Sequence, residues 1–108
     1  MSRVVITGLG VVAPNGVGKE AFTNAIKEGR SGVQFYQELE DLNFSCCIGG
    51  IPEVTEDLKR EYFSELQLRN FNAPDILYGC MAGIDAWKDA GLTINEEVDF
   101  ESGLVFGA

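Results

Sequence analysis

The chain has 108 residues, 45% of them hydrophobic and 23% charged, and its formal net charge is −9 at pH 7. This composition is typical of a folded globular domain and excludes a disordered chain. The acidic balance also disfavours nucleic acid and anionic membrane surfaces as partners, because both attract a positive face.

The first predicted element is a strand over residues 4–12, which is rich in Val and Ile without polar alternation. Such a run favours a central strand of a parallel sheet, covered on both faces. Residues 19–28 then place apolar side chains on one face at helical spacing, and Gly29 is typical of the position just past a helix. We therefore predict a short amphipathic helix after the first strand.

Residues 30–53 show no sustained periodicity. We predict a structured excursion there, with a short strand near 33–36 and an extended piece over 46–51. Residues 55–70 follow with Thr55 as a candidate N-cap, acids in the first turn and apolar residues at helical spacing. This pattern predicts one helix.

The best-defined predicted element is a helix over residues 74–90. Pro74 suits its first position, where a missing N–H is tolerated, small residues on one face favour tight packing, and Gly91 ends it. Residues 103–106 predict a second buried strand, which in the full-length protein we expect to lie parallel to residues 4–12 through a right-handed crossover. The order of elements indicates the α/β class.

The last predicted strand stands at the very end of the sequence. A central strand without cover is unstable alone, so we expect residues 1–108 to be the N-terminal part of a larger α/β enzyme.

Gly8, Gly10 and Ala13 formally match the dinucleotide-binding fingerprint G-x-G-x-x-G/A. Two observations disfavour a nucleotide site. The turn continues until about Lys19, so no helix N-terminus meets a pyrophosphate, and no acid for the ribose stands about 20 residues further on, where Arg30 lies. We interpret the two glycines as positions of close backbone packing.

The three cysteines are Cys46, Cys47 and Cys80, and the chain contains no histidine. Their odd number and spacing indicate neither a disulfide framework nor a metal site. Without a histidine the usual Cys-His nucleophile cannot form, so we expect small buried thiols instead. No signal peptide or membrane-spanning run is present in the sequence, and a reducing cytoplasm fits these features.

Four blocks together resemble the start of the β-ketoacyl-acyl-carrier-protein synthases, especially the synthase II type. They are V-V-I-T-G-L-G-V-V-A-P-N-G at 4–16, G-R-S-G-V at 29–33, Y-G-x-x-A-G-x-x-A-x-x-D-A-G-L at 78–92, and G-L-V-F-G at 103–107. The resemblance implies an α/β fold, in which residues 1–108 begin the first half of a thiolase-like layered αβαβα arrangement.

The resemblance also implies an acyltransferase of fatty acid synthesis that carries out decarboxylative Claisen condensation with malonyl-acyl carrier protein. In that family the acyl group is held on a cysteine and two histidines assist. All three lie downstream of residue 108 by the family pattern, so we expect no catalytic residue, metal or cofactor within this chain, and fragment 1–108 alone to be inactive. Acyl carrier protein is the implied partner, and a homodimer the implied assembly.

Family members bind their acidic carrier protein through basic residues before the long helix. Arg69 matches one such position, and Lys59 and Arg60 stand nearby. The chain departs from the family where Asn70 replaces a second basic residue and where residues 72–75 include one extra residue.

Two alternatives remain open. One keeps the fold but makes the chain part of a nucleophile-lacking partner subunit, as in heterodimeric ketosynthases of polyketide or aryl polyene synthesis. The other is a standalone acidic binding module of 108 residues.

Overall fold

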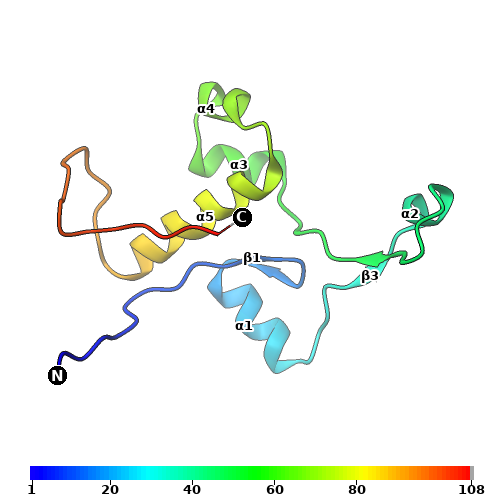
Figure 1. Cartoon of the computed structure of the whole chain (residues 1–108), viewed down its shortest axis with the longest axis horizontal. Coiled ribbons are helices and arrows are strands. Elements are labelled where there is room, and N and C mark those ends of the chain that lie inside the picture. Colours follow the sequence, from blue (N-terminus) through cyan, green and yellow to red (C-terminus); the bar gives the residue numbers. More distant parts are fainter. Residues whose placement is uncertain (108) are drawn as a thin grey trace.

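A computed structural model describes residues 1–107. Its elements in chain order are β1 (Val12–Ala13), β2 (Gly16–Val17), α1 (Lys19–Lys27), β3 (Gln34–Phe35), α2 (Gln37–Asp41), β4 (Ile48–Gly49), α3 (Glu56–Tyr62), α4 (Glu65–Asn70) and α5 (Pro74–Asp89). Figure 1 shows α5 in the middle, with the N-terminal segment and α1 on one side and α3 and α4 on the other. The chain is thus a mixture of helices and small sheets, as expected for a part of an α/β protein.

The described residues bury little apolar surface. Ala25, Leu77 and Met81 are the buried hydrophobic side chains among residues 1–107, and no polar side chain there is buried. Ala25 lies on α1, whereas Leu77 and Met81 lie one turn apart on α5. The core of the described chain is therefore confined to small areas around these two helices.

The first segment is not the long strand that the sequence predicts. Only Val12 and Ala13 are in a strand, and they pair antiparallel with β2 in a tight hairpin. Val4 and Ile6 are 95% and 84% exposed. The prediction of a strand over 4–12 is wrong here because a strand needs a second strand to pair with, and within the described residues no strand pairs with residues 4–11.

The predicted strand over residues 103–106 is also absent from the described residues. Its parallel pairing with residues 4–12 is expected of the complete protein and stays a prediction. The segment instead passes along α5 (Figure 1), where the Phe106 ring lies so close to Gly79 that an added Cβ there would overlap it. Leu104 and Val105 remain exposed.

Gly8 and Gly10 pack against the small-residue face of α5. An added Cβ at Gly10 would overlap the Ala82 carbonyl oxygen and lie 2.7 Å from the Ala86 amide nitrogen. One at Gly8 would lie 2.6 Å from the Ala90 nitrogen. The predicted close approach of backbones is confirmed, and α1 begins only at residue 19, outside the glycine motif.

The two amphipathic helices agree with prediction. α1 ends before Gly29, which has a φ of 66°, and α5 begins with Pro74 and ends before Gly91, which has a φ of 75°. Glycine reaches this left-handed region without the steric cost of a Cβ, so both helices stop where the sequence indicates.

The predicted helix over residues 55–70 is divided into α3 and α4. Thr55 caps α3 as expected, since its hydroxyl accepts from the Leu58 N–H at 3.2 Å. Phe63 is extended, and Ser64 then starts α4 with a capping box to Gln67. The prediction of one helix is wrong because this second cap satisfies the free N–H groups of a new helix start.

Both short extended pieces of the excursion are confirmed, and they pair antiparallel as β3 and β4. Helix α2 between them was not predicted. The Gln37 side-chain amide donates to Glu40 and Asp41 at 2.7 and 3.0 Å, which supports this single acidic turn until Asn43 adopts a φ of 60°.

Asp89, the last residue of α5, joins three segments. Its carboxylate accepts a hydrogen bond from the Lys19 ammonium and another from the Leu9 N–H at 3.0 Å. The hydrogen bond from Lys19, followed by the one from Leu9, lowers the pKa of Asp89 below its ordinary value of 3.8. The carboxylate thereby ties the N-terminal segment and α1 to the end of α5.

Asp89→Asn is expected to lower the thermal stability of the complete protein at pH 7. Because the pKa is lower in the folded state, the stabilisation is fully present above the unfolded pKa of about 4 and is lost as the pH falls through the folded value. The melting temperatures of the two proteins should therefore converge as the pH falls below about 5, first through the unfolded pKa and then through the lower folded one. Glu96→Gln, at an exposed carboxylate without a hydrogen bond to it in residues 1–107, is the control, and a constant difference across pH contradicts the assignment.

Within residues 1–107, no helix has both the length and the apolar character needed to cross a membrane.

Candidate functional site

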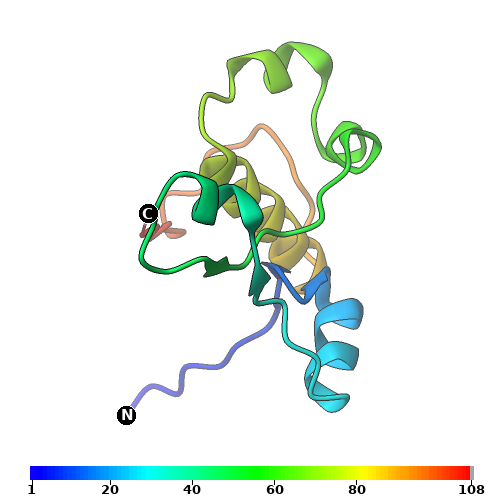
Figure 2. The same cartoon turned by 90° about the vertical axis from the view of Figure 1, so that its right-hand side faces the viewer.

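The three basic residues that the sequence predicts to bind the carrier lie near the ends of two short helices. Lys59 and Arg60 are in the last turn of α3, and Arg69 is in the last turn of α4. Figures 1 and 2 show α3 and α4 on the same side of α5. We call the exposed side of these two helices the α3–α4 face.

The charges of the three residues differ in how far they are already paired. Lys59 pairs with Glu56 at 2.7 Å, and Arg60 pairs with Asp57 at 3.2 Å. The hydrogen bond from Lys59 and its charge lower the pKa of Glu56, so the carboxylate of this pair is ionised near neutral pH. Arg69 is exposed and makes no ion pair within residues 1–107. It is the basic residue of the three that is most available to an acidic partner.

A cleft of about 280 Å³ separates α3 from α4 and the start of α5. Lys59 lies at this cleft with a side chain that is only 25% exposed. The other lining residues are Glu56, Leu68, Phe71, Asn72, Ala73, Pro74, Leu77 and Tyr78. The walls thus combine apolar side chains with the Lys59–Glu56 ion pair and the Asn72 amide.

Helix α3 is attached to α5 by a tyrosine–aspartate hydrogen bond. The Tyr62 hydroxyl donates to the Asp85 carboxylate, with its oxygen 2.9 Å from both carboxylate oxygens. Burial, followed by the hydrogen bond to Asp85, raises the pKa of Tyr62 to about 12, so the hydroxyl keeps its proton near neutral pH. The Lys88 ammonium lies 5.7 Å from the centre of the same ring, within the range of a cation–π contact.

Sequence reasoning missed this pair. Tyr62 falls at helical spacing with apolar neighbours, and Asp85 stands 23 residues away on another helix. No local pattern connects the two, because only the packing of α3 on α5 brings them together.

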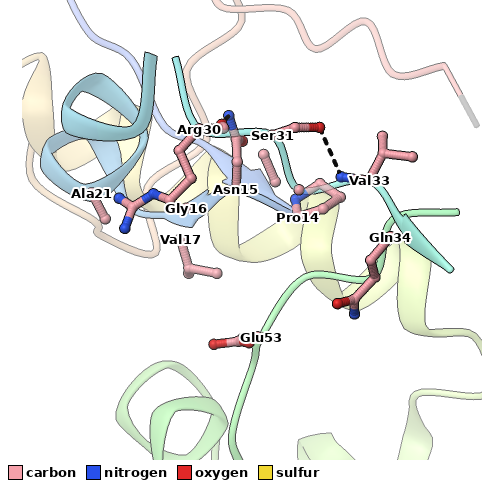
Figure 3. Close-up of a pocket in the computed structure, with 12 residues that line it drawn as sticks. Pro14, Asn15, Gly16, Val17, Ala21, Arg30, Ser31, Val33, Gln34 and Glu53 are labelled. Atoms are coloured by element: carbon pink, nitrogen blue, oxygen red, sulfur yellow. Dashed lines mark hydrogen bonds between the residues drawn. The ribbon is translucent and has the colours of Figure 1, made fainter. Parts of the chain in front are cut away.

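A second candidate region is a cavity of about 400 Å³ between the β1–β2 hairpin and the loop before β3 (Figure 3). Its charged side chains are those of Arg30 and Glu53, and its amide side chains are those of Asn15 and Gln34. The Ser31 hydroxyl accepts from the Val33 N–H at 3.1 Å. The lining has no histidine or cysteine, so these residues form a polar surface without a nucleophile–base pair.

The cysteines are less covered than the sequence predicts. Cys46 and Cys80 are exposed and Cys47 is half-buried, and all three are free thiols. The prediction of buried thiols is wrong here because α5 and the loop before β4 present these residues on faces that nothing in residues 1–107 covers. No cluster of three or more Cys, Asp or Glu residues suited to a metal ion is found in the same residues.

The family profile described as "Beta-ketoacyl synthase, N-terminal domain" matches residues 1–108. The chain belongs to the β-ketoacyl synthase family. This confirms the resemblance that the four sequence blocks indicate.

Several curated β-ketoacyl synthases align with nearly the whole chain. The 3-oxoacyl-[acyl-carrier-protein] synthase 2 of Vibrio harveyi is 36% identical over 98% of the chain and 25% of its own length. Synthase 1 of Haemophilus influenzae is 30% identical over 100% of the chain and 26% of its length. The tetracenomycin polyketide synthase ketoacyl synthase beta subunit of Streptomyces glaucescens is 31% identical over 97% of the chain and 25% of its length. The chain thus spans about a quarter of these relatives.

Proposed function

We propose that residues 1–108 form the N-terminal part of a β-ketoacyl-acyl-carrier-protein synthase that elongates acyl chains in fatty acid synthesis. The observation that carries this proposal is the family match over the whole chain, together with relatives named as 3-oxoacyl-[acyl-carrier-protein] synthases. We also propose that the chain begins the first half of a thiolase-like layered αβαβα fold in a cytoplasmic homodimer.

The proposed reaction is a condensation between two thioesters. An acyl group is first held on a cysteine; malonyl on the carrier protein then loses CO₂, and the resulting carbanion attacks the acyl carbonyl carbon. The new carbon–carbon bond forms as the cysteine thiolate leaves, and the 3-oxoacyl product remains on the carrier. The cysteine and two assisting histidines belong outside residues 1–108 in this proposal, which agrees with a chain that contains no histidine.

The part of the reaction assigned to this chain is carrier binding. A protein segment of net charge −9 needs a local positive surface to attract an acidic partner, and the α3–α4 face provides Arg69 with Lys59 and Arg60 nearby. Arg69 carries most of the attraction because the other two are already paired with carboxylates.

The activity is tested by incubating the complete protein with acyl-acyl carrier protein and then with malonyl-acyl carrier protein. We expect mass spectrometry to find the acyl group on a cysteine outside residues 1–108, and a 3-oxoacyl product to form as CO₂ is released. Acyl transfer to Cys46, Cys47 or Cys80, or no transfer with any acyl donor, contradicts the proposal.

A second candidate is a partner subunit that lacks the nucleophile. The similarity to the Streptomyces glaucescens ketoacyl synthase beta subunit over 97% of the chain favours it. The same experiment separates the two: a partner subunit takes up no acyl group, purifies as a heterodimer with an active ketosynthase and changes the length of the product.

Arg69→Glu is expected to raise the KM for carrier-bound substrate about threefold to tenfold at low salt, since charge reversal at a binding rim acts on encounter. The difference should shrink as ionic strength rises. Turnover of a small acyl thioester without the carrier should be unchanged. Steady-state kinetics with both substrates between low and high salt provide the measurement.

Lys27→Glu is the matched control for Arg69→Glu. It makes the same change of net charge at an exposed position in α1, away from the α3–α4 face (Figure 1). An equal rise of KM in the control, or an equal loss with the small thioester, shows that Arg69 does not act through carrier binding.

A further inference from the structure

We propose that the hydrogen bond between Tyr62 and Asp85 is a positioning device, which holds the α3–α4 face in the orientation that binds the carrier. The inference rests on the proposed carrier binding and assigns to it two residues besides the three basic ones. Tyr62 and Asp85 act through Lys59, Arg60 and Arg69, because the placement of α3 and α4 determines where these three charged groups lie.

The first reason is that the two helices have little else to hold them. Among the described residues, neither α3 nor α4 contains a buried side chain, and the helices have seven and six residues. Isolated helices of this length are unstable in water, so their position depends on tertiary contacts. A single strong contact therefore has a large effect on the orientation of both.

The second reason is the position of the hydrogen bond. Tyr62 is the last residue of α3, directly before the extended Phe63 that separates α3 from α4. Its partner Asp85 lies in the fourth turn of α5, the longest helix of the described residues. The bond thus fixes the joint between the two docking helices to the most regular element of the described chain.

The third reason is that neighbouring contacts act on the same joint. Lys88 lies over the Tyr62 ring, and the Phe63 and Phe71 rings, at the two ends of α4, are 5.0 Å apart. Aromatic pairs at this distance are favourable, and this one links the residues that flank α4 on either side. The Tyr62 hydroxyl is the directional contact of this group, because its acceptor is a charged carboxylate.

Tyr62→Phe in the complete protein is the decisive variant. It keeps the ring and the Lys88 contact but removes the donor to Asp85. We expect the KM for carrier-bound substrate to rise about fivefold, as the loss of a hydrogen bond to a charged group allows, while turnover of a small acyl thioester stays unchanged. Asp85→Ala should have the same effect, and the double variant should be no worse than either single one.

Tyr36→Phe is the matched control. Its hydroxyl accepts a hydrogen bond from Gln34 at 3.0 Å in the β3–β4 region, so the same atom is removed at a site far from α3 along the chain. Melting temperatures of all variants show whether each protein is folded. A rise of KM that appears in Tyr62→Phe and Asp85→Ala but not in Tyr36→Phe supports the positioning role.

The possible failures are distinguishable. If Arg69→Glu raises the KM and Tyr62→Phe does not, the carrier-binding face stands and the positioning role is overturned. If Tyr62→Phe weakens turnover of the small thioester to the same extent, the pair only stabilises the fold. If neither variant affects the carrier-bound substrate, carrier binding lies elsewhere, and both the proposed role of Arg69 and the positioning role are overturned. Separate additive effects in the double variant also overturn the pairing.

Discussion

Residues 1–108 produced on their own are expected to be insoluble or to show no cooperative unfolding transition. The described chain exposes 8922 Å² of surface, whereas a compact monomer of this mass exposes about 5,900 Å². Its radius of gyration is 16.8 Å, against about 13 Å for a compact domain of this length. Three buried apolar side chains cannot offset the entropy lost on ordering a hundred residues.

The measurement is circular dichroism during heating, with a hydrophobic dye to detect exposed apolar surface. We expect a gradual signal change and strong dye binding for the fragment, and a sharp transition for the complete protein. The dye should bind, and aggregation should begin, at the exposed apolar residues of the two end segments, which include Val4, Ile6, Leu104 and Val105. A sharp, reversible transition of the fragment would show that residues 1–108 form an independent domain.

Gly10→Ala is expected to destabilise the complete protein strongly, by about 3 kcal/mol, at the upper end of the usual cost of overpacking. The added methyl group would overlap the Ala82 carbonyl oxygen and approach the Ala86 amide nitrogen to 2.7 Å. Both atoms belong to the backbone of α5, which cannot move aside as a flexible side chain can. The first segment would have to separate from the helix.

Gly49→Ala is the matched control because it adds the same methyl group in β4. There the new Cβ would make ordinary contact with the Tyr36 ring at 3.6 Å. Soluble yield and melting temperature should change little in this variant and fall sharply in Gly10→Ala. Comparable stability of the two proteins would mean that the first segment does not pack against α5 as described.

The candidate site was predictable only in part. Arg69, Lys59 and Arg60 were found through the family resemblance, and the structure places them on two helices that lie on the same side of α5 (Figure 2). The structure also shows that Lys59 and Arg60 are paired with carboxylates of α3, which leaves Arg69 as the unpaired residue of the three within residues 1–107. Tyr62 and Asp85 carry no local signal, since their meeting depends on the angle at which α3 packs on α5.

The break between α3 and α4 has a local signal in the sequence. Ser64 and Gln67 have the spacing of a capping box, which marks the start of a helix, although the apolar period of residues 55–70 continues across the break and predicts one helix. The apolar period indicates which face of a helix is buried, whereas a cap such as Ser64 indicates where the backbone hydrogen bonds of a helix begin. The cap determines the boundary because it satisfies N–H groups that would otherwise have no partner.

The sequence by itself determined the features whose physical causes are local. The bounds of α1 and α5 follow from the apolar spacing, from Pro74 and from the glycine after each helix. The close approach of the first segment to the α5 backbone follows from Gly8 and Gly10, which have no Cβ. Tertiary structure alone decided the rest. A run such as residues 4–12 or 103–106 has the composition of a strand, but it becomes one only where another backbone supplies its hydrogen bonds, and no residue within the run encodes that partner.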